Sequence, residues 1–129
     1  MTFKVHIITP EKALPELDAD HVTIVAIDGQ VGIRTDHAPL VALVAEKDGY
    51  AMIKTFGKEG YRAFALKGGV AQMLNNQLKI LSPRAVDVHQ LDTAAVAKKA
   101  ESAKDEGEKA WLQHQLAVAQ IWPAPTAHV

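Results

Sequence analysis

The stretch 28-DGQVGIRTDHAPL-40 holds the residues of this chain whose types and spacing come closest to a chemical function. Asp36 and His37 are adjacent, and a carboxylate beside an imidazole is a pairing used in acid–base catalysis. In an extended loop, however, adjacent side chains point apart. A hydrolase would also need a nucleophile, and neither serine, Ser82 or Ser102, sits in a nucleophile-elbow pattern. No catalytic residue is therefore predicted, and the loop is expected to make a contact.

Other kinds of site are disfavoured by composition and spacing. The chain has no cysteine, and none of its six histidines forms a His-x-x-x-His or similar pair, so no metal site is predicted. Lys67-Gly68-Gly69 has neither a Walker pattern nor a dinucleotide fingerprint, so no cofactor is predicted. The 14 basic residues nearly cancel the 15 acidic ones, which argues against a nucleic-acid partner.

Short strands and turns are expected to position this loop. The apolar residues alternate with polar ones or form short runs over 3–7, 22–27, 31–33, 40–44, 51–56, 61–66, 70–74 and 78–81. Turn signals stand at Asp28-Gly29, at Asp48-Gly49, at 57–60 and at Asn75-Asn76, and Asp48-Gly49 reads as a type I′ hairpin. Gly68-Gly69 suggests a bulge or a close backbone approach. Residues 1–89 are thus predicted to form an antiparallel β-sandwich or flattened barrel.

From residue 90 the pattern becomes helical. Asp92 is a good N-cap for a first helix, Gly107 is predicted to end it as the C′ residue, and a second helix is expected from Glu108. Residues 90–122 are predicted to form an antiparallel hairpin of two helices of about 14 residues each, followed by a flexible tail over 123–129. The broad apolar face of the second helix is expected either to form the core of the hairpin or to contact a partner; it comprises Trp111, Leu112, Leu116, Val118 and Trp122.

The chain offers no apolar window of about 20 residues, so direct membrane insertion is not expected. Its first residues lack the apolar region of a signal peptide. Any membrane association is expected to come through a partner.

Four motifs, in order, resemble the epsilon subunit of bacterial F-type ATP synthases. The opening FKVHIITPEK is similar to the family's V-x-T-P-E-K, DGQVGI to D-G-E-F-G-I, and HAPLV to H-A-P-L. LKGGV, followed by Asn76 and Leu81, is similar to V-x-G-G-F…N…V-x-I-L. Each motif is weak alone, but four at the family's spacing, followed by a helical hairpin, are specific.

The resemblance implies a non-catalytic rotor subunit of the central stalk. Such a subunit binds the gamma subunit and the c-ring and helps to couple proton or sodium flow to ATP synthesis. In many bacterial relatives the hairpin can extend up the stalk toward the alpha and beta subunits and inhibit ATP hydrolysis. The expected location is peripheral, on the cytoplasmic face of the bacterial cell membrane. The loop of Arg34, Thr35, Asp36 and His37 is then interpreted as a contact surface facing the c-ring.

The chain departs from the family pattern in the hairpin. The ATP-binding pattern I/L-D-x-x-R-A aligns with residues 91–96, and its arginine position is Ala95. Without this guanidinium a triphosphate loses a charge-assisted contact, so ATP binding is predicted to be weak or absent. Lys109 is the single Lys or Arg in 107–129, and weak inhibition is predicted for the same electrostatic reason.

Two other readings stay open from the residues alone. One is a free-standing β-sandwich binding or regulatory module. The other is a hydrolase that uses Asp36 and His37. Co-purification with gamma would separate the stalk reading from both.

Overall fold

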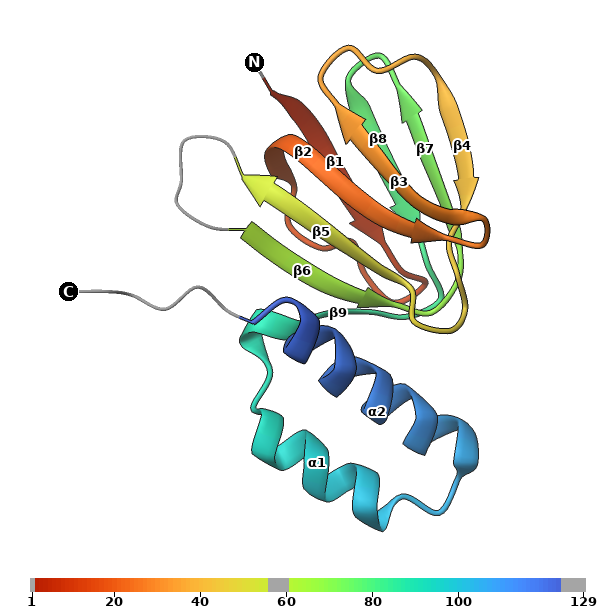
Figure 1. The fold of residues 1–129 in the computed structure, drawn as a ribbon, viewed down its shortest axis with the longest axis vertical. Helices are drawn as coiled ribbons and strands as arrows, with labels where there is room; N and C mark the ends of the chain where they lie inside the picture. Colours follow the sequence, from red (N-terminus) through yellow and green to blue (C-terminus); the bar gives the residue numbers. More distant parts are fainter. Residues whose placement is uncertain (1, 56–60, 124–129) are drawn as a thin grey trace, which may run out of the picture.

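The structure is a computed structural model that describes residues 2–55 and 61–123. Within these residues, nine strands precede two helices (Figure 1). The strands are β1 (Phe3–Ile8), β2 (Leu17–Ala26), β3 (Gly29–Arg34), β4 (Leu40–Leu43), β5 (Tyr50–Thr55), β6 (Tyr61–Leu66), β7 (Val70–Leu74), β8 (Gln77–Leu81) and β9 (Ala85–Asp87). The 3₁₀ turn η1 (Val88–Gln90) leads into α1 (Thr93–Ser102) and α2 (Glu106–Ile121). The predicted class, a β-sandwich followed by a helical hairpin, is confirmed.

The strands form one continuous sheet that folds over on itself. Its order is β4-β7-β8-β1-β2-β5-β6-β9, and β3 pairs with the second part of β2. The ladders are antiparallel except that of β1 with β8, which is parallel. The sheet turns at β2, whose register shifts between Ala19 and His21: the first part pairs with β1, and the second pairs with β3 and β5.

The main core lies between the two halves of the folded sheet. Alternation along the strands sends one side chain in two inward. Fully buried members include Phe3 and Ile7 from β1, Ile24 from β2, Ile53 from β5 and Ile80 from β8. Their exposed or half-buried neighbours form the two outer faces.

The tight turns divide into confirmed and wrong predictions. Asn75 and Asn76 both have positive φ (51° and 59°) and join β7 to β8, as a type I′ hairpin requires. Asp28-Gly29 joins β2 to β3, as expected. Asp48-Gly49 is not a hairpin turn, because β4 pairs with β7 while β5 pairs with β2 and β6.

Close backbone contacts explain why glycine stands at positions 49 and 69. A Cβ on Gly49 would lie 2.2 Å from the Ala45 carbonyl oxygen, so this position needs glycine for space. Gly69 shows the expected close approach, since its Cβ would lie 2.0 Å from the Leu81 oxygen; it precedes β7 and has φ of 112°. The predicted turn at 57–60 and the strand end at Phe56 lie outside the described residues.

The helices differ in detail from the sequence-based expectation. Asp92 is the N-cap of α1, and its carboxylate accepts from the Ala95 amide at 3.2 Å. Gly107 is not the C′ residue: α1 ends at Ser102, and Gly107 lies in the first turn of α2. The reason is Asp105, whose carboxylate caps α2 by accepting from the Glu108 amide at 2.9 Å. The helices are therefore 10 and 16 residues long rather than equal.

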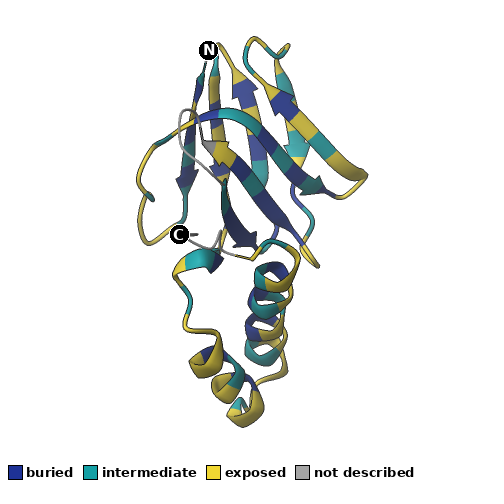
Figure 2. Ribbon diagram, turned by 60° about the vertical axis from the view of Figure 1, so that its left-hand side comes forward, coloured by how far each residue is buried: buried dark blue, intermediate teal, exposed yellow. Residues whose placement is uncertain are grey.

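The hairpin packs on one side of the sandwich. Figures 1 and 2 show α2 next to the strands and α1 farther out, with most of its surface exposed. α2 contacts β6 and η1 directly.

Candidate functional site

The loop that joins β3 to β4 lies at the end of the sandwich opposite the helices (Figure 1). Its backbone is closed by the His37 amide, which donates to the Arg34 carbonyl at 3.1 Å. Asp36 has a positive φ of 63°, a conformation that Asp tolerates better than most residues. Arg34 and Asp36 are exposed, while Thr35 and His37 are half-buried.

Asp36 and His37 do not form an acid–base pair. The Asp36 amide donates to Asn76 Oδ1 at 2.7 Å, and Asn76 Nδ2 donates back to Asp36 Oδ1 at 2.8 Å. His37 Nδ1 donates to the Ala38 carbonyl at 2.7 Å. The carboxylate is thus used to tie the loop to the β7–β8 turn, and this reciprocal pair supports a shaped contact surface rather than catalysis.

The second candidate surface, the apolar face of α2, is divided between two contacts. Trp111 and Val118 are buried against the sandwich in a cluster with Tyr50, Ala63 and Val88. The small residues Ala63 and Ala65 of β6 leave room for the indole ring. This cluster joins the helices to the strands.

The other residues of that face serve different neighbours. Leu112 is buried against Val96 and Ala100 of α1, and Leu116 packs on the same cluster half-buried. Trp122 follows α2 and meets Tyr50 and Tyr61 edge-on, with ring centroids 6.1 and 5.3 Å apart. All five predicted residues therefore line contacts within the chain in this state.

Polar contacts fix both ends of α2 on the sandwich. Near its start, Arg84 donates to Glu108 at 2.9 Å, and its guanidinium lies 5.4 Å from the centroid of the Trp111 ring. In the middle, His114 Nε2 donates to the Gly49 carbonyl at 2.8 Å.

At the far end, His89 Nε2 donates to the Trp122 carbonyl at 2.9 Å, and the Tyr61 hydroxyl donates to the Pro123 carbonyl at 2.5 Å. A groove of about 530 Å³ runs between α2 and the β4–β5 connection. The docked hairpin is thus held along the whole length of α2.

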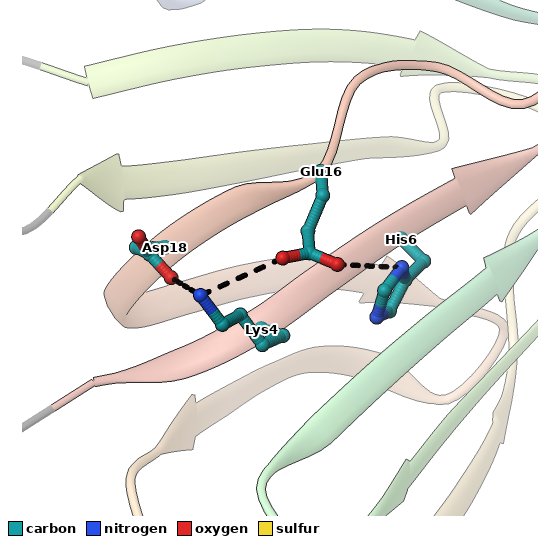
Figure 3. A network of polar contacts seen from close by, with 4 residues as sticks. All are labelled: Lys4, His6, Glu16 and Asp18. Carbon is teal, nitrogen blue, oxygen red and sulfur yellow. Dashed lines mark hydrogen bonds and ion pairs between the residues drawn. The ribbon is translucent and has the colours of Figure 1, made fainter.

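A further polar network joins β1 to the start of β2 and to Glu16, the residue just before it (Figure 3). Lys4 Nζ lies 2.5 Å from Asp18 and 3.5 Å from Glu16, and His6 Nδ1 lies 3.6 Å from Glu16. The Asp18 carboxylate raises the pKa of Lys4. About half of each of the Lys4, Glu16 and Asp18 side chains is exposed, so water screens these pairs, and the network reads as a solvated face of the sheet.

Two kinds of feature are absent from residues 2–55 and 61–123. Those residues hold no group of three His, Asp or Glu side chains that would bind a metal ion. No helix in the same part of the chain is long and apolar enough to cross a membrane.

Comparison with known proteins identifies the family. The family described as "ATP synthase, Delta/Epsilon chain, beta-sandwich domain" matches residues 2–88, which is the whole sandwich. The chain belongs to this family.

Curated relatives extend the likeness of this epsilon-type chain into the hairpin. It is 32% identical to the "ATP synthase epsilon chain, sodium ion specific" of Propionigenium modestum, over 92% of this chain and 84% of that one. It is 35% identical to the ATP synthase epsilon chain of a Synechococcus strain, over 84% of this chain and 74% of the relative. The epsilon family predicted from the four motifs is therefore confirmed.

Solved structures agree with the fold. A chain of the Euglena gracilis mitochondrial ATP synthase superposes with a TM-score of 0.64, at 17% identity, over 92% of this chain and 78% of that one. A chain from the central stalk and c-ring of the Tetrahymena thermophila enzyme gives 0.55, at 12% identity, over 92% of each chain. The epsilon-type chain shares the sandwich-and-hairpin fold with both.

Sequence reasoning missed the polar partners of the epsilon hairpin. Arg84 and His89 follow the last predicted strand, and nothing in their spacing showed that they would meet α2. A usable signal was present at His114, because a polar side chain one turn from Trp111 lies on the same helical face.

Proposed function

We propose that this chain is the epsilon subunit of the rotor of an F-type ATP synthase and works by binding and coupling without catalysing a reaction itself. The family match over residues 2–88 carries this proposal. The two hydrogen bonds between Asp36 and Asn76 agree with it, because they use the carboxylate of the best acid–base candidate to hold the loop in place. The proposed location is peripheral, on the cytoplasmic face of the bacterial cell membrane.

The proposed partners are the gamma subunit and the c-ring. The loop of Arg34, Thr35, Asp36 and His37 remains our proposed contact toward the c-ring. Its tie to the β7–β8 turn supports this, since a contact loop that is fixed before binding loses less conformational entropy on binding.

The hairpin is proposed to regulate weakly through the alpha and beta subunits. Extension would break the Trp111 cluster and the bonds of His114 and Arg84. The extended hairpin would gain little electrostatic attraction to the alpha and beta subunits, because residues 107–129 carry the single basic side chain Lys109. Both effects favour the docked hairpin.

A pull-down against gamma tests the main proposal. The full chain and a chain that ends at His89 are each mixed with purified gamma, and the bound fraction is measured. We expect both to bind, because the family match lies in the sandwich. Failure of the full chain to bind gamma would leave the free-standing binding module as the better reading.

The regulatory proposal has a separate test. ATPase rates of the assembled catalytic head are compared with the full chain and with the chain ending at His89. We expect a change of less than about twofold. A several-fold rise on truncation would contradict weak inhibition.

A further inference from the structure

A row of three basic side chains crosses the outer face of the sheet. His21 of β2 stands in register with Arg34 of β3 on one side and with Lys54 of β5 on the other. The next residues, Val22, Ile33 and Ile53, are buried in the core, so the three basic side chains project from the opposite face. They line a hollow of about 330 Å³ together with Asp20.

The hairpin leaves this part of the face uncovered. Farther along the same strands, Val25 and Met52 are partly buried in the cluster that contains Trp111 and Val118. Arg34 and Lys54 are exposed, and His21 is half-buried. The row therefore lies beside the docked hairpin, open to a partner.

Among the described residues, no ion pair balances the positive charges of Arg34 and Lys54. Arg34 and Lys54 each lie directly opposite His21, and because like charges at such positions destabilise a sheet, protonation of His21 is disfavoured. Within residues 2–55 and 61–123, neither Arg34 nor Lys54 lies within ion-pair distance of a carboxylate. Of the described residues, Asp20 alone brings a carboxylate to the lining of the hollow, against two full positive charges.

His21 is held firmly at the centre of the row. Its Nε2 lies 3.0 Å from the Thr23 hydroxyl, and a Cβ on Gly32 would come within 3.4 Å of its ring. Its Nδ1 is buried and has no hydrogen-bond partner in the described part of the chain. Burial lowers the pKa of His21, and the positive charge of Arg34 lowers it further. Both effects disfavour the protonated imidazole.

We propose that Arg34 and Lys54, on either side of His21, bind carboxylates of an acidic segment of a partner protein. Three strands in register place the two cations about two strand spacings apart at their Cα atoms, roughly 10 Å. This separation suits two carboxylates of an extended chain better than one small anion. Strand amides lie in the plane of the sheet and point toward neighbouring strands, so on this face only side chains are available as donors, whereas a free oxyanion is typically enclosed by amides.

The acidic-segment proposal does not rest on the rotor role. Its test uses the isolated full-length chain, so a failure of the gamma pull-down leaves it unaffected. The probe is a capped hexaglutamate peptide, titrated at low salt into ¹⁵N-labelled chain. Chemical shifts of the His21 ring and of the Arg34 and Lys54 amides are followed, and the same spectra report whether each variant is folded.

We expect saturable shifts along the row. Arg34→Gln and Lys54→Gln are each expected to weaken binding about two- to fivefold, and the double variant should show no saturable shifts at these positions. Lys79→Gln is the matched control, because Lys79 is an exposed lysine on β8, in the other half of the folded sheet. It should bind the peptide as the wild type does.

Three results would overturn the proposal. The first is equal peptide binding by the wild type and by the double variant. The second is tighter binding of inorganic phosphate than of the peptide at matched ionic strength, which would indicate a free-oxyanion site. The third is an equal loss of peptide binding in Lys79→Gln and in the double variant, which would mean that the peptide responds to net charge and not to the row.

Discussion

Arg84 lies over the indole ring of Trp111, with its guanidinium carbon 5.4 Å from the ring centroid. The two residues belong to different parts of the chain: Arg84 precedes β9, and Trp111 is in α2. The same guanidinium donates to Glu108 one turn earlier on the helix. This one side chain therefore links the sandwich to the start of α2 by a ring contact and by an ion pair.

Replacing Arg84 should loosen the hairpin modestly. Arg84→Ala is expected to lower the free energy of unfolding by about 1 kcal/mol, because the ion pair is half-exposed and the ring contact adds a similar small amount. Arg84→Lys keeps the charge but loses planar stacking, so it should recover part of this loss. Urea denaturation measures both. Full recovery with lysine would show that the Trp111 contact contributes nothing.

Trp111 should matter more than any other side chain of α2. Trp111→Ala removes a buried aromatic ring between helix and sheet, and we expect a loss of about 3 kcal/mol in the free energy of unfolding. Ile121→Ala, at a position 56% exposed on the same helix, is the control and should cost less than about 0.5 kcal/mol. Hydrogen exchange of α2 amides measures undocking directly. Similar losses for the two variants would contradict the packing described above.

The tie between Asp36 and Asn76 should be measurable at the tip of the sandwich. Asn76→Gly keeps the positive φ of this turn residue but removes the amide, and we expect a loss of about 1–2 kcal/mol. Asn75→Gly, at the neighbouring positive-φ position, is the matched control and should be nearly neutral. A double-mutant cycle with Asp36→Ala isolates the pair. A coupling energy of zero would argue against the tie.

ATP should bind poorly to this chain. Asp92 already caps α1, and the neighbouring position that would supply a guanidinium is Ala95. We expect calorimetry to show a Kd of about 1 mM or weaker, and Ala95→Arg to improve it. Glu101→Arg, which adds a cation to an exposed position near the end of the same helix, controls for charge alone. Micromolar binding by the wild type would refute this prediction.

Acid should reduce stability partly through His21. Its pKa is lowered in the folded chain, so the unfolded chain holds the proton more tightly. His21 thus has no effect well above its ordinary pKa of 6.5, and it lowers stability as the pH falls through that value. The free energy of unfolding is compared at pH 7.5 and 5.5 for the wild type and for His21→Gln. The variant should lose less on acidification; an equal or larger loss would speak against the shift.

The class of the fold could be predicted because local patterns determine it. Alternation along 3–7 and 61–66, the double Asn turn and the Asp92 cap each reflect interactions between near neighbours in sequence. The hairpin predicted at Asp48-Gly49 was wrong because a turn signal does not show which strands pair. Gly49 is instead required because a side chain there would clash with the Ala45 carbonyl. The prediction that Gly107 ends the first helix was wrong because Asp105 caps α2, which therefore begins before Gly107.

The contact surfaces were less predictable, because they join distant segments. Asp36 and Asn76 are 40 residues apart, and His114 and Gly49 are 65 apart. The row of His21, Arg34 and Lys54 depends on two strand registers, which one sequence does not reveal. Residue types indicated that the loop and the α2 face would make contacts, but only the fold shows which groups they touch.

The parallel pairing of β1 with β8 has a consequence for synthesis of the chain. β1 is synthesised first, yet β8, the strand that pairs with its second edge, ends at Leu81. On the ribosome, the β2–β3 hairpin and the short ladder of β1 with the first part of β2 can form early, whereas the other edge of β1 must wait for β8, more than 70 residues away, with the slow closure that such separation brings. A stalled nascent chain cut before β8 should therefore leave β1 open to protease, and one extended past Leu81 should protect it.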